Sequence, residues 1–500
     1  MKTILITLDS LNRRYLPVYG NSWVRTPNLD RLASRSCVFD QHWCGSAPCM
    51  PARHDILVGR LEFLERNWSG IQPYDVPLTE LLREAGGFSH MLTDHYHYFH
   101  AGGENYHSAF DSWEFIRGQE YDSYQSAFGS FEQKEHYGKY VHQYQENRRK
   151  FMCEAEFPTP RTLQCAASWV RQFASEDNWF LYLDCFDPHE PFDVPDDFED
   201  IYEDEYDGPF FNWPEYGKVN VPPNAIKHIR KQYAKTLTMA DRWIGHLLDV
   251  LDELDLWDEI AIILSTDHGY MLGEHGYFAK NYMPGYNELY HIPLIIHLPG
   301  MNSTTRCRAI TQTVDLFPTI LEIMGVDYSC VPYPLHGHSL LPLLRGETKR
   351  IREYALFGIF GKQVNIFDGR YTYFRAAARE DNMPLNVYVS LPTTIGHYWN
   401  LKHIKNISKV EMGPFLAWTD YPVYKISAHN ISLSDPSHRF DRRYAEIEEN
   451  MLFDIIEDYQ QKIPLQNKVL EQYCCELLVK ALKEHDAPVE QYERLGLKNM

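Results

Sequence analysis

Three short runs of apolar and β-branched residues, far apart in the chain, most constrain how it can fold. They are residues 3–8, 179–183 and 261–266. Each run lacks the polar alternation of a strand with one face in water, so each predicts a strand buried on both faces. Such strands belong to the interior of a parallel sheet with helices on both sides. We therefore expect an α/β protein with a large mixed, mostly parallel sheet sandwiched by helices.

Acidic residues or histidines follow each of these runs. Asp9 follows the first run, His189 lies shortly after the second, and Asp267 and His268 come directly after the third. In open parallel sheets, ligands bind at the carboxyl ends of the strands, so these side chains are expected at one edge. A single Asp in such a place would most simply be a turn residue. Three such endings are better explained by a common site.

The pattern C-x-P-x-R from Cys49 to Arg53 is a third feature of the chain. The simplest interpretation is a buried cysteine before a helix over residues 51–60, because proline suits the first turn of a helix. The pattern also resembles the signature of the type I sulfatases, in which the cysteine is oxidised to formylglycine. Five residues with two free positions are a weak signal alone, so other segments must decide.

Four further segments resemble the same family and occur in its order along the chain. They are residues 187–192 (the central histidine loop), 267–280 (the second signature), 314–321 (a late core helix) and 451–458 (a C-terminal element). With these matches the chain is identified as a member of the type I, formylglycine-dependent sulfatases of the alkaline phosphatase superfamily.

The resemblance implies the hydrolysis of sulfate esters at a metal centre. Its metal ligands would be Asp9, Cys49, Asp267 and His268. Carboxylates suit Ca²⁺ or Mg²⁺, while a histidine favours Mn²⁺; Ca²⁺ is the first candidate and Mn²⁺ or Mg²⁺ the alternatives. Cys49, as formylglycine, would also be the nucleophile, and Arg53 would stabilise its ionised hydroxyl.

The remaining implied site residues bind sulfate or move protons. Lys280 would bind the sulfate oxygens, His189 would also bind substrate and protonate the leaving alcohol, and His97 would contact the hydroxyl of the nucleophile. Two positions depart from the family pattern. His95 stands where lysine is usual, and a histidine there would titrate near neutral pH. Ser10 stands where many members have a second acid, which puts its ligand role in doubt.

Two other functions are left open by the same residues. Relatives with this signature hydrolyse phosphonate monoesters or phosphate diesters, whose tetrahedral oxyanions resemble sulfate. If Cys49 is not modified, the chain would instead be a non-enzymatic binding protein. The residues do not identify the natural substrate.

Charge, apolar runs and the start of the chain bear on partners and location. A formal net charge of −21 argues against nucleic-acid binding, which needs a basic surface. No apolar run is long enough to span a membrane, and the first strand begins too early to leave room for a leader. Unless a leader has been removed, we expect a cytoplasmic protein with reduced cysteines. Its partners would be a small sulfated substrate and either a formylglycine-generating or an anaerobic sulfatase-maturating enzyme; a homo-oligomer is left open.

The chain is long enough for two units. We expect a catalytic domain over residues 1–350 and a smaller C-terminal α+β subdomain over residues 351–500, with antiparallel strands and a helix at 466–484. Residues 100–150 predict an irregular insertion beside the site. His397 and Lys425 belong to a long C-terminal insertion that borders either the substrate or another subunit.

Overall fold

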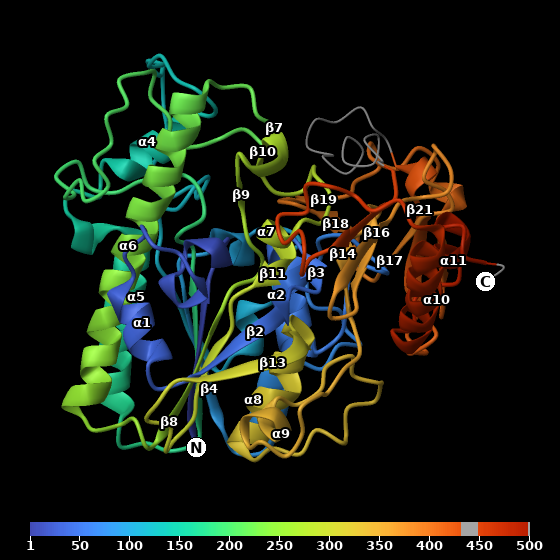
Figure 1. Cartoon of the computed structure of the whole chain (residues 1–500), viewed down its shortest axis with the longest axis horizontal. Helices are drawn as coiled ribbons and strands as arrows, with labels where there is room; N and C mark the ends of the chain where they lie inside the picture. The colour runs from blue at the N-terminus through green and yellow to red at the C-terminus, as the bar shows by residue number, and fades with distance from the viewer. Residues whose placement is uncertain (432–448, 499–500) are drawn as a thin grey trace.

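The structure is a computed structural model that describes residues 1–431 and 449–498, and within them the largest sheet has nine strands. Its parallel part contains, in spatial order, β8 (Ile260–Ser265), β1 (Lys2–Leu8), β6 (Trp179–Cys185), β4 (Phe88–Thr93) and β5 (Ser112–Phe115). The three apolar runs are therefore neighbouring strands with β1 in the middle (Figure 1). This confirms the predicted sheet.

Four other strands make the sheet mixed. β12 (Ile295–His297) lies antiparallel to β8 and to β2 (Cys37–Trp43). β11 (His291–Ile292) pairs with β2 antiparallel, and β13 (Thr305–Gln312) pairs with it in parallel.

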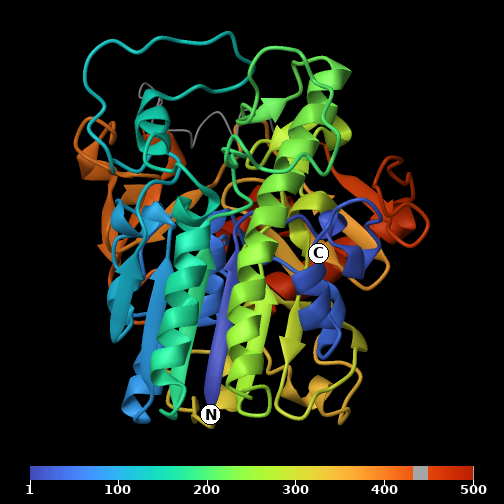
Figure 2. The ribbon, with the colours of Figure 1, turned by 90° about the vertical axis from the view of Figure 1, so that its left-hand side faces the viewer.

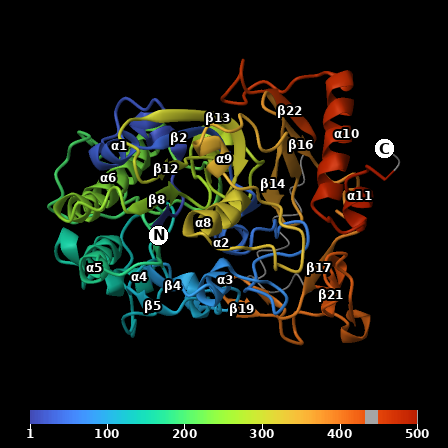
Figure 3. The same ribbon diagram turned by 90° about the horizontal axis from the view of Figure 1, so that it is seen from below.

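Helices cover both faces of the sheet, as predicted (Figure 3). One face carries α1 (Pro27–Ala33), α5 (Pro158–Phe173) and α6 (Pro223–Glu253), and the other carries α2 (Cys49–Val58), α3 (Leu78–Glu84) and α8 (Leu316–Met324). Successive strand residues point to opposite faces. Ile4 therefore packs in one core with Leu237 of α6, and Leu5 packs in another with Phe317 of α8.

A smaller sheet lies beside the α2 and α8 layer, and α10 (Lys468–Glu484) covers its outer side (Figure 3). Its strands are β22 (Met451–Asp454), β16 (Tyr371–Arg375), β15 (Val364–Phe367), β14 (Ala355–Ile359) and β3 (Ser46–Ala47), in this order. The first four pair antiparallel, which confirms the predicted C-terminal sheet and helix. β3 pairs with β14 in parallel and stands just before Cys49, so this sheet supports the segment that carries the cysteine. The domain boundary near residue 350 stays a prediction.

Residues 100–150 are less irregular than expected. They contain β5, whose aromatic residues Trp113 and Phe115 suit a strand, and α4 (His142–Arg148). The rest of this segment loops over the carboxyl ends of the strands, at the top of Figure 2. A short sheet of β7 (Gly217–Lys218), β10 (Tyr277–Ala279) and β9 (Met271–Leu272) lies at the same end. None of the helices in the described parts of the chain has the length and apolar character needed to span a bilayer.

Candidate active site and metal centre

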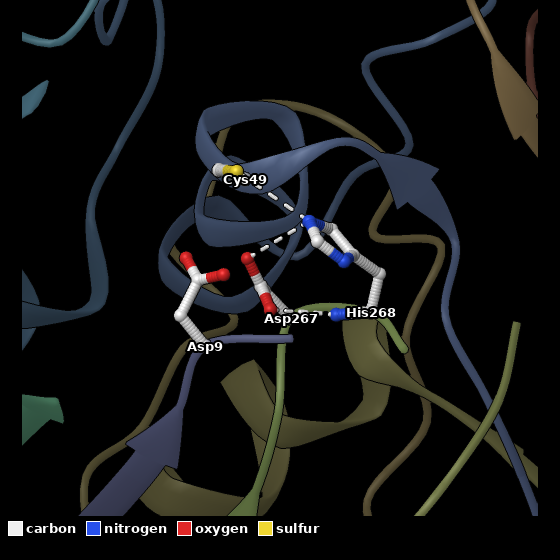
Figure 4. A group of neighbouring side chains, drawn as sticks. All are labelled: Asp9, Cys49, Asp267 and His268. Carbon is white, nitrogen blue, oxygen red and sulfur yellow. Dashed lines mark hydrogen bonds and ion pairs between the residues drawn. The ribbon is translucent and has the colours of Figure 1, made fainter. Parts of the chain in front are cut away.

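Four side chains with metal-binding atoms meet at the carboxyl ends of β1 and β8 (Figure 4). Asp9 follows β1, Asp267 and His268 follow β8, and Cys49 opens α2. One donor atom of each lies within 4.8 Å of the others, and all four residues are buried. Two carboxylates and an imidazole beside residue 49 form a donor set that fits one divalent cation. The structure thus brings together the four predicted ligands.

The guanidinium of Arg53, a fully buried side chain, joins three carboxylates beside this cluster. It donates to Asp267 at 2.7 Å, to Asp9 at 3.0 Å and, through two N–H groups, to Asp184 at 2.7 and 2.9 Å. Asp184 lies in β6 and was missed in the sequence. An acid next to an apolar strand run was the available signal, because a buried carboxylate needs a cationic partner.

Lys280 reaches the same cluster from the segment after β10. Its Nζ lies 3.3 Å from Cys49 Sγ, 3.0 Å from Ser10 Oγ and 3.5 Å from Asp9 Oδ1. Ser10 also donates from Oγ to Asp9 Oδ1 at 2.8 Å and from its backbone N–H to Asp267 Oδ1 at 3.1 Å. Its φ of 63° is uncommon for a residue with a side chain. Ser10 thus orients Asp9, Asp267 and Lys280.

The charges of the cluster leave an excess of negative charge. Asp9, Asp184 and Asp267 supply three carboxylates against the cations of Arg53 and Lys280. Burial alone would raise the pKa of Asp9, but Lys280 and other nearby positive groups lower it well below its ordinary value. Asp9 is therefore ionised at neutral pH, and the excess negative charge favours a bound cation.

The thiol of Cys49 lies 3.4 Å from His268 Nε2. Burial, the largest cause, and the charge of Asp9 raise the pKa of this thiol well above its ordinary value. Since the thiolate is the reactive form of cysteine, the described residues around Cys49 disfavour the unmodified thiol as a nucleophile.

The three predicted histidines lie around residue 49. His95 is buried with Nε2 3.1 Å from Asp9 Oδ2, and burial lowers its pKa. Burial is the largest cause of this shift and Arg53 adds to it, so the neutral imidazole is favoured over the expected titration near neutral pH. His97 is buried with no hydrogen-bond partner for Nδ1, and His189 donates from Nδ1 to the carbonyl of Glu190 at 2.6 Å.

A cavity of about 330 Å³, the active-site cavity, opens onto residue 49. The predicted residues that line it are Cys49, His97, His189 and Lys280. Its other lining residues include Trp68, Tyr96, Glu120, Tyr121, Tyr216 and His397. Glu120 and Tyr121 confirm that the 100–150 segment borders the site, and His397 places part of the C-terminal insertion there. Lys425 instead pairs with Glu411 on β20 (Glu411–Gly413).

Comparisons with known proteins agree with this geometry. The family model described as Sulfatase matches residues 2–326. The chain is 24% identical over 412 residues to choline-sulfatase of Rhizobium meliloti (strain 1021), covering 75% of this chain and 78% of that protein. It is 26% identical over 400 residues to iduronate 2-sulfatase of Homo sapiens, covering 65% and 69%. It is 26% identical over 408 residues to the multifunctional alkaline phosphatase superfamily protein PehA of Trinickia caryophylli, covering 68% and 76%.

A solved structure shows the same fold at low identity. The phosphonate monoester hydrolase of Agrobacterium radiobacter superposes with a TM-score of 0.66 at 17% identity, covering 97% of this chain and 96% of that one. The two chains therefore share one fold over almost their whole length.

Proposed function

Because the chain belongs to the sulfatase family, we propose that it hydrolyses a sulfate ester with formylglycine at position 49 and one divalent metal. The observation that carries this proposal is the convergence of Asp9, Cys49, Asp267, His268 and Lys280 beside one cavity. The high pKa of the unmodified thiol supports the modification, since the thiol itself is not activated.

Asp9, Asp267, His268 and residue 49 would hold the metal. When bound, the metal would supply a Lewis acid for the ester oxygens and formylglycine a hydrated aldehyde as nucleophile. A nitrogen ligand and only two carboxylates provide few of the hard oxygens that Ca²⁺ prefers, so Mn²⁺ is as good a candidate as Ca²⁺. Arg53 would hold both carboxylates in place.

Lys280 would bind the sulfate oxygens, with His97 in the cavity wall beside them. His95 does not line the cavity and would act through its contact with Asp9. His189 would give a proton to the leaving alcohol oxygen. Burial, the largest cause, lowers the pKa of His189 to about 4, and Glu190 partly offsets this. A bound sulfate ester adds negative charge beside the imidazole and raises that pKa, so protonation of His189 would accompany substrate binding.

The test is a rate comparison on three esters with the same leaving group: 4-nitrophenyl sulfate, 4-nitrophenyl phenylphosphonate and bis(4-nitrophenyl) phosphate. Since the leaving group is shared, differences report only on the transferred group. The sulfate should have the highest kcat/KM. The mass of the peptide containing residue 49 should show the aldehyde or its hydrate, and an active protein with only thiol there would contradict the proposal.

Phosphonate monoester or phosphodiester hydrolysis is the second candidate, since the phosphonate monoester hydrolase of Agrobacterium radiobacter has the same fold. All three esters carry one negative charge at neutral pH, so the charges of Lys280 and the metal do not separate them. A higher rate on either phosphorus ester would favour this function. An unmodified Cys49 with no turnover would favour a binding protein. The cytoplasmic location and the maturation enzyme as partner stay predictions.

A further inference from the structure

The active-site cavity is also lined by groups that the proposed reaction does not use. They are the aromatic side chains of Trp68, Tyr96, Tyr121 and Tyr216 and the carboxyl group of Glu120. An acid between aromatic rings is the environment that binds an organic cation, because the faces of the rings are also negative.

Glu120 is held in this wall by an uncommon backbone conformation. It is 6% exposed, and its φ of 42° lies in the left-handed region that residues with a side chain rarely adopt. The hydroxyl of Tyr96 donates to its Oε2 at 2.9 Å. No lysine or arginine forms an ion pair with Glu120 in residues 1–431 and 449–498. A buried carboxylate without a cationic partner is costly, and a cationic ligand would remove that cost.

Two lysines near this wall, Lys139 and Lys280, act on Glu120 from a distance but form no ion pair with it among the described residues. Lys280 is the only lysine or arginine among the described residues that line the cavity, and it contacts Cys49. Lys139 lies outside the lining, with Nζ 4.9 Å from the ring centre of Tyr216. Burial, the largest cause, and the charge of Glu190 raise the pKa of Glu120 to about 7, while Lys139, Tyr96 and Lys280 lower it.

We propose that the alcohol part of the substrate carries an ammonium group, bound by the carboxylate of Glu120 and the surrounding aromatic rings. This inference rests on the proposed function, since it adds a cation site to the sulfate site at Lys280. The substrate would then be a small zwitterionic ester, which a cavity of about 330 Å³ can hold. A sugar with several sulfates would instead place negative charge against Glu120.

The test compares two esters of nearly equal shape, 2-(trimethylammonio)ethyl sulfate and 3,3-dimethylbutyl sulfate. In the second ester a neutral carbon atom replaces the charged nitrogen of the first. Their alcohols differ in acidity, so the decisive quantity is how the ratio of their kcat/KM values changes on Glu120→Gln. We expect this ratio to fall about tenfold or more. Glu135→Gln is the matched control, because it removes the same charge from an exposed residue outside the cavity and should not change the ratio. The kcat/KM for 2-aminoethyl sulfate, measured beside that for the trimethylammonio ester, shows whether the site prefers a quaternary or a primary ammonium group.

A binding measurement separates this inference from the proposed function. Cys49→Ala protein, which cannot turn over, is titrated calorimetrically with 2-(trimethylammonio)ethanol and with 3,3-dimethylbutan-1-ol. The ammonium alcohol should bind about tenfold or more tightly, and Glu120→Gln should remove the difference. The comparison of the two alcohols on Cys49→Ala protein needs no change at Glu120, so it tests the inference even if Glu120→Gln fails to fold.

The outcomes decide the two proposals independently. Sulfate turnover with no preference for the ammonium ester or alcohol leaves the sulfatase function standing and overturns the cation site. Preferential binding of the ammonium alcohol without any sulfate turnover supports the cation site and overturns the sulfatase function. Equal binding of both alcohols overturns the inference whatever the turnover.

Discussion

Replacing Arg53 with lysine tests whether one guanidinium holds the catalytic carboxylates together. Its five hydrogen bonds go to Asp184 (two), Asp9, Asp267 and the Cys49 carbonyl, at 2.7 to 3.1 Å. A guanidinium has five N–H donors in a fixed plane, whereas an ammonium has three and no such plane. Arg53→Lys keeps the charge but must lose at least two of the five bonds.

The structure sets the size of the loss. Hydrogen bonds to charged groups contribute about 1.5–3 kcal/mol each, so two lost bonds should cost about 3–6 kcal/mol. Arg53 and its three carboxylate partners are fully buried, so water cannot easily replace the missing donors. Measured against a typical free energy of unfolding of about 5–15 kcal/mol, this loss is large.

The assay is urea unfolding of Arg53→Lys and wild type in one buffer, with divalent-metal analysis and kcat/KM for 4-nitrophenyl sulfate. Arg60→Lys is the matched control, since Arg60 is also buried but donates to a single carboxylate of the described residues, that of Asp486, at 3.3 Å. Arg53→Lys should lose more stability than the control and bind less metal. A loss below about 1 kcal/mol, within the range of ordinary substitutions, or equal to that of Arg60→Lys would refute the assigned role.

Four other outcomes are expected. Cys49→Ser should fold normally but be nearly inactive, because serine lacks the second hydroxyl of a hydrated aldehyde; near-normal multiple turnover would rule out that nucleophile. Asp267→Asn should lower both bound metal and activity, about tenfold or more, as should chelation, and active protein without stoichiometric metal would defeat the metal centre. His189→Ala should slow alkyl sulfates far more than nitrophenyl sulfates, and an equal loss on all esters would mean that His189 positions sulfate. The pKa of Glu120 is about 7 before a cation binds, and only its ionised form attracts the cation. The affinity for the ammonium alcohol should therefore rise from about pH 6 to 8, and a calorimetric affinity that does not change with pH would contradict this.

Much of the architecture could be predicted because burial leaves a local pattern. The apolar runs at residues 3–8, 179–183 and 261–266 became β1, β6 and β8, side by side and parallel. The residues after them therefore had to share one edge, which placed Asp9 and Asp267 together. The segment at 100–150 was predicted less well, because β5 is a short edge strand with a weak pattern.

Other features depend on pairings between distant segments, which no local pattern encodes. Arg53 meets Asp184 across 131 positions of the chain, and β3 meets β14 across about 300. Strand order decides both contacts.

The sequence by itself thus determined the sheet, its reactive edge and the residues able to hold a metal, because strand burial and the polarity of strand ends are local properties. Only the tertiary structure decided which buried charges are paired. It gave Arg53 three carboxylate partners and, within residues 1–431 and 449–498, left Glu120 in the cavity wall without an ion pair to a lysine or arginine. The physical reason is that the energy of a buried charge depends on the distance to its neighbours, and folding sets those distances.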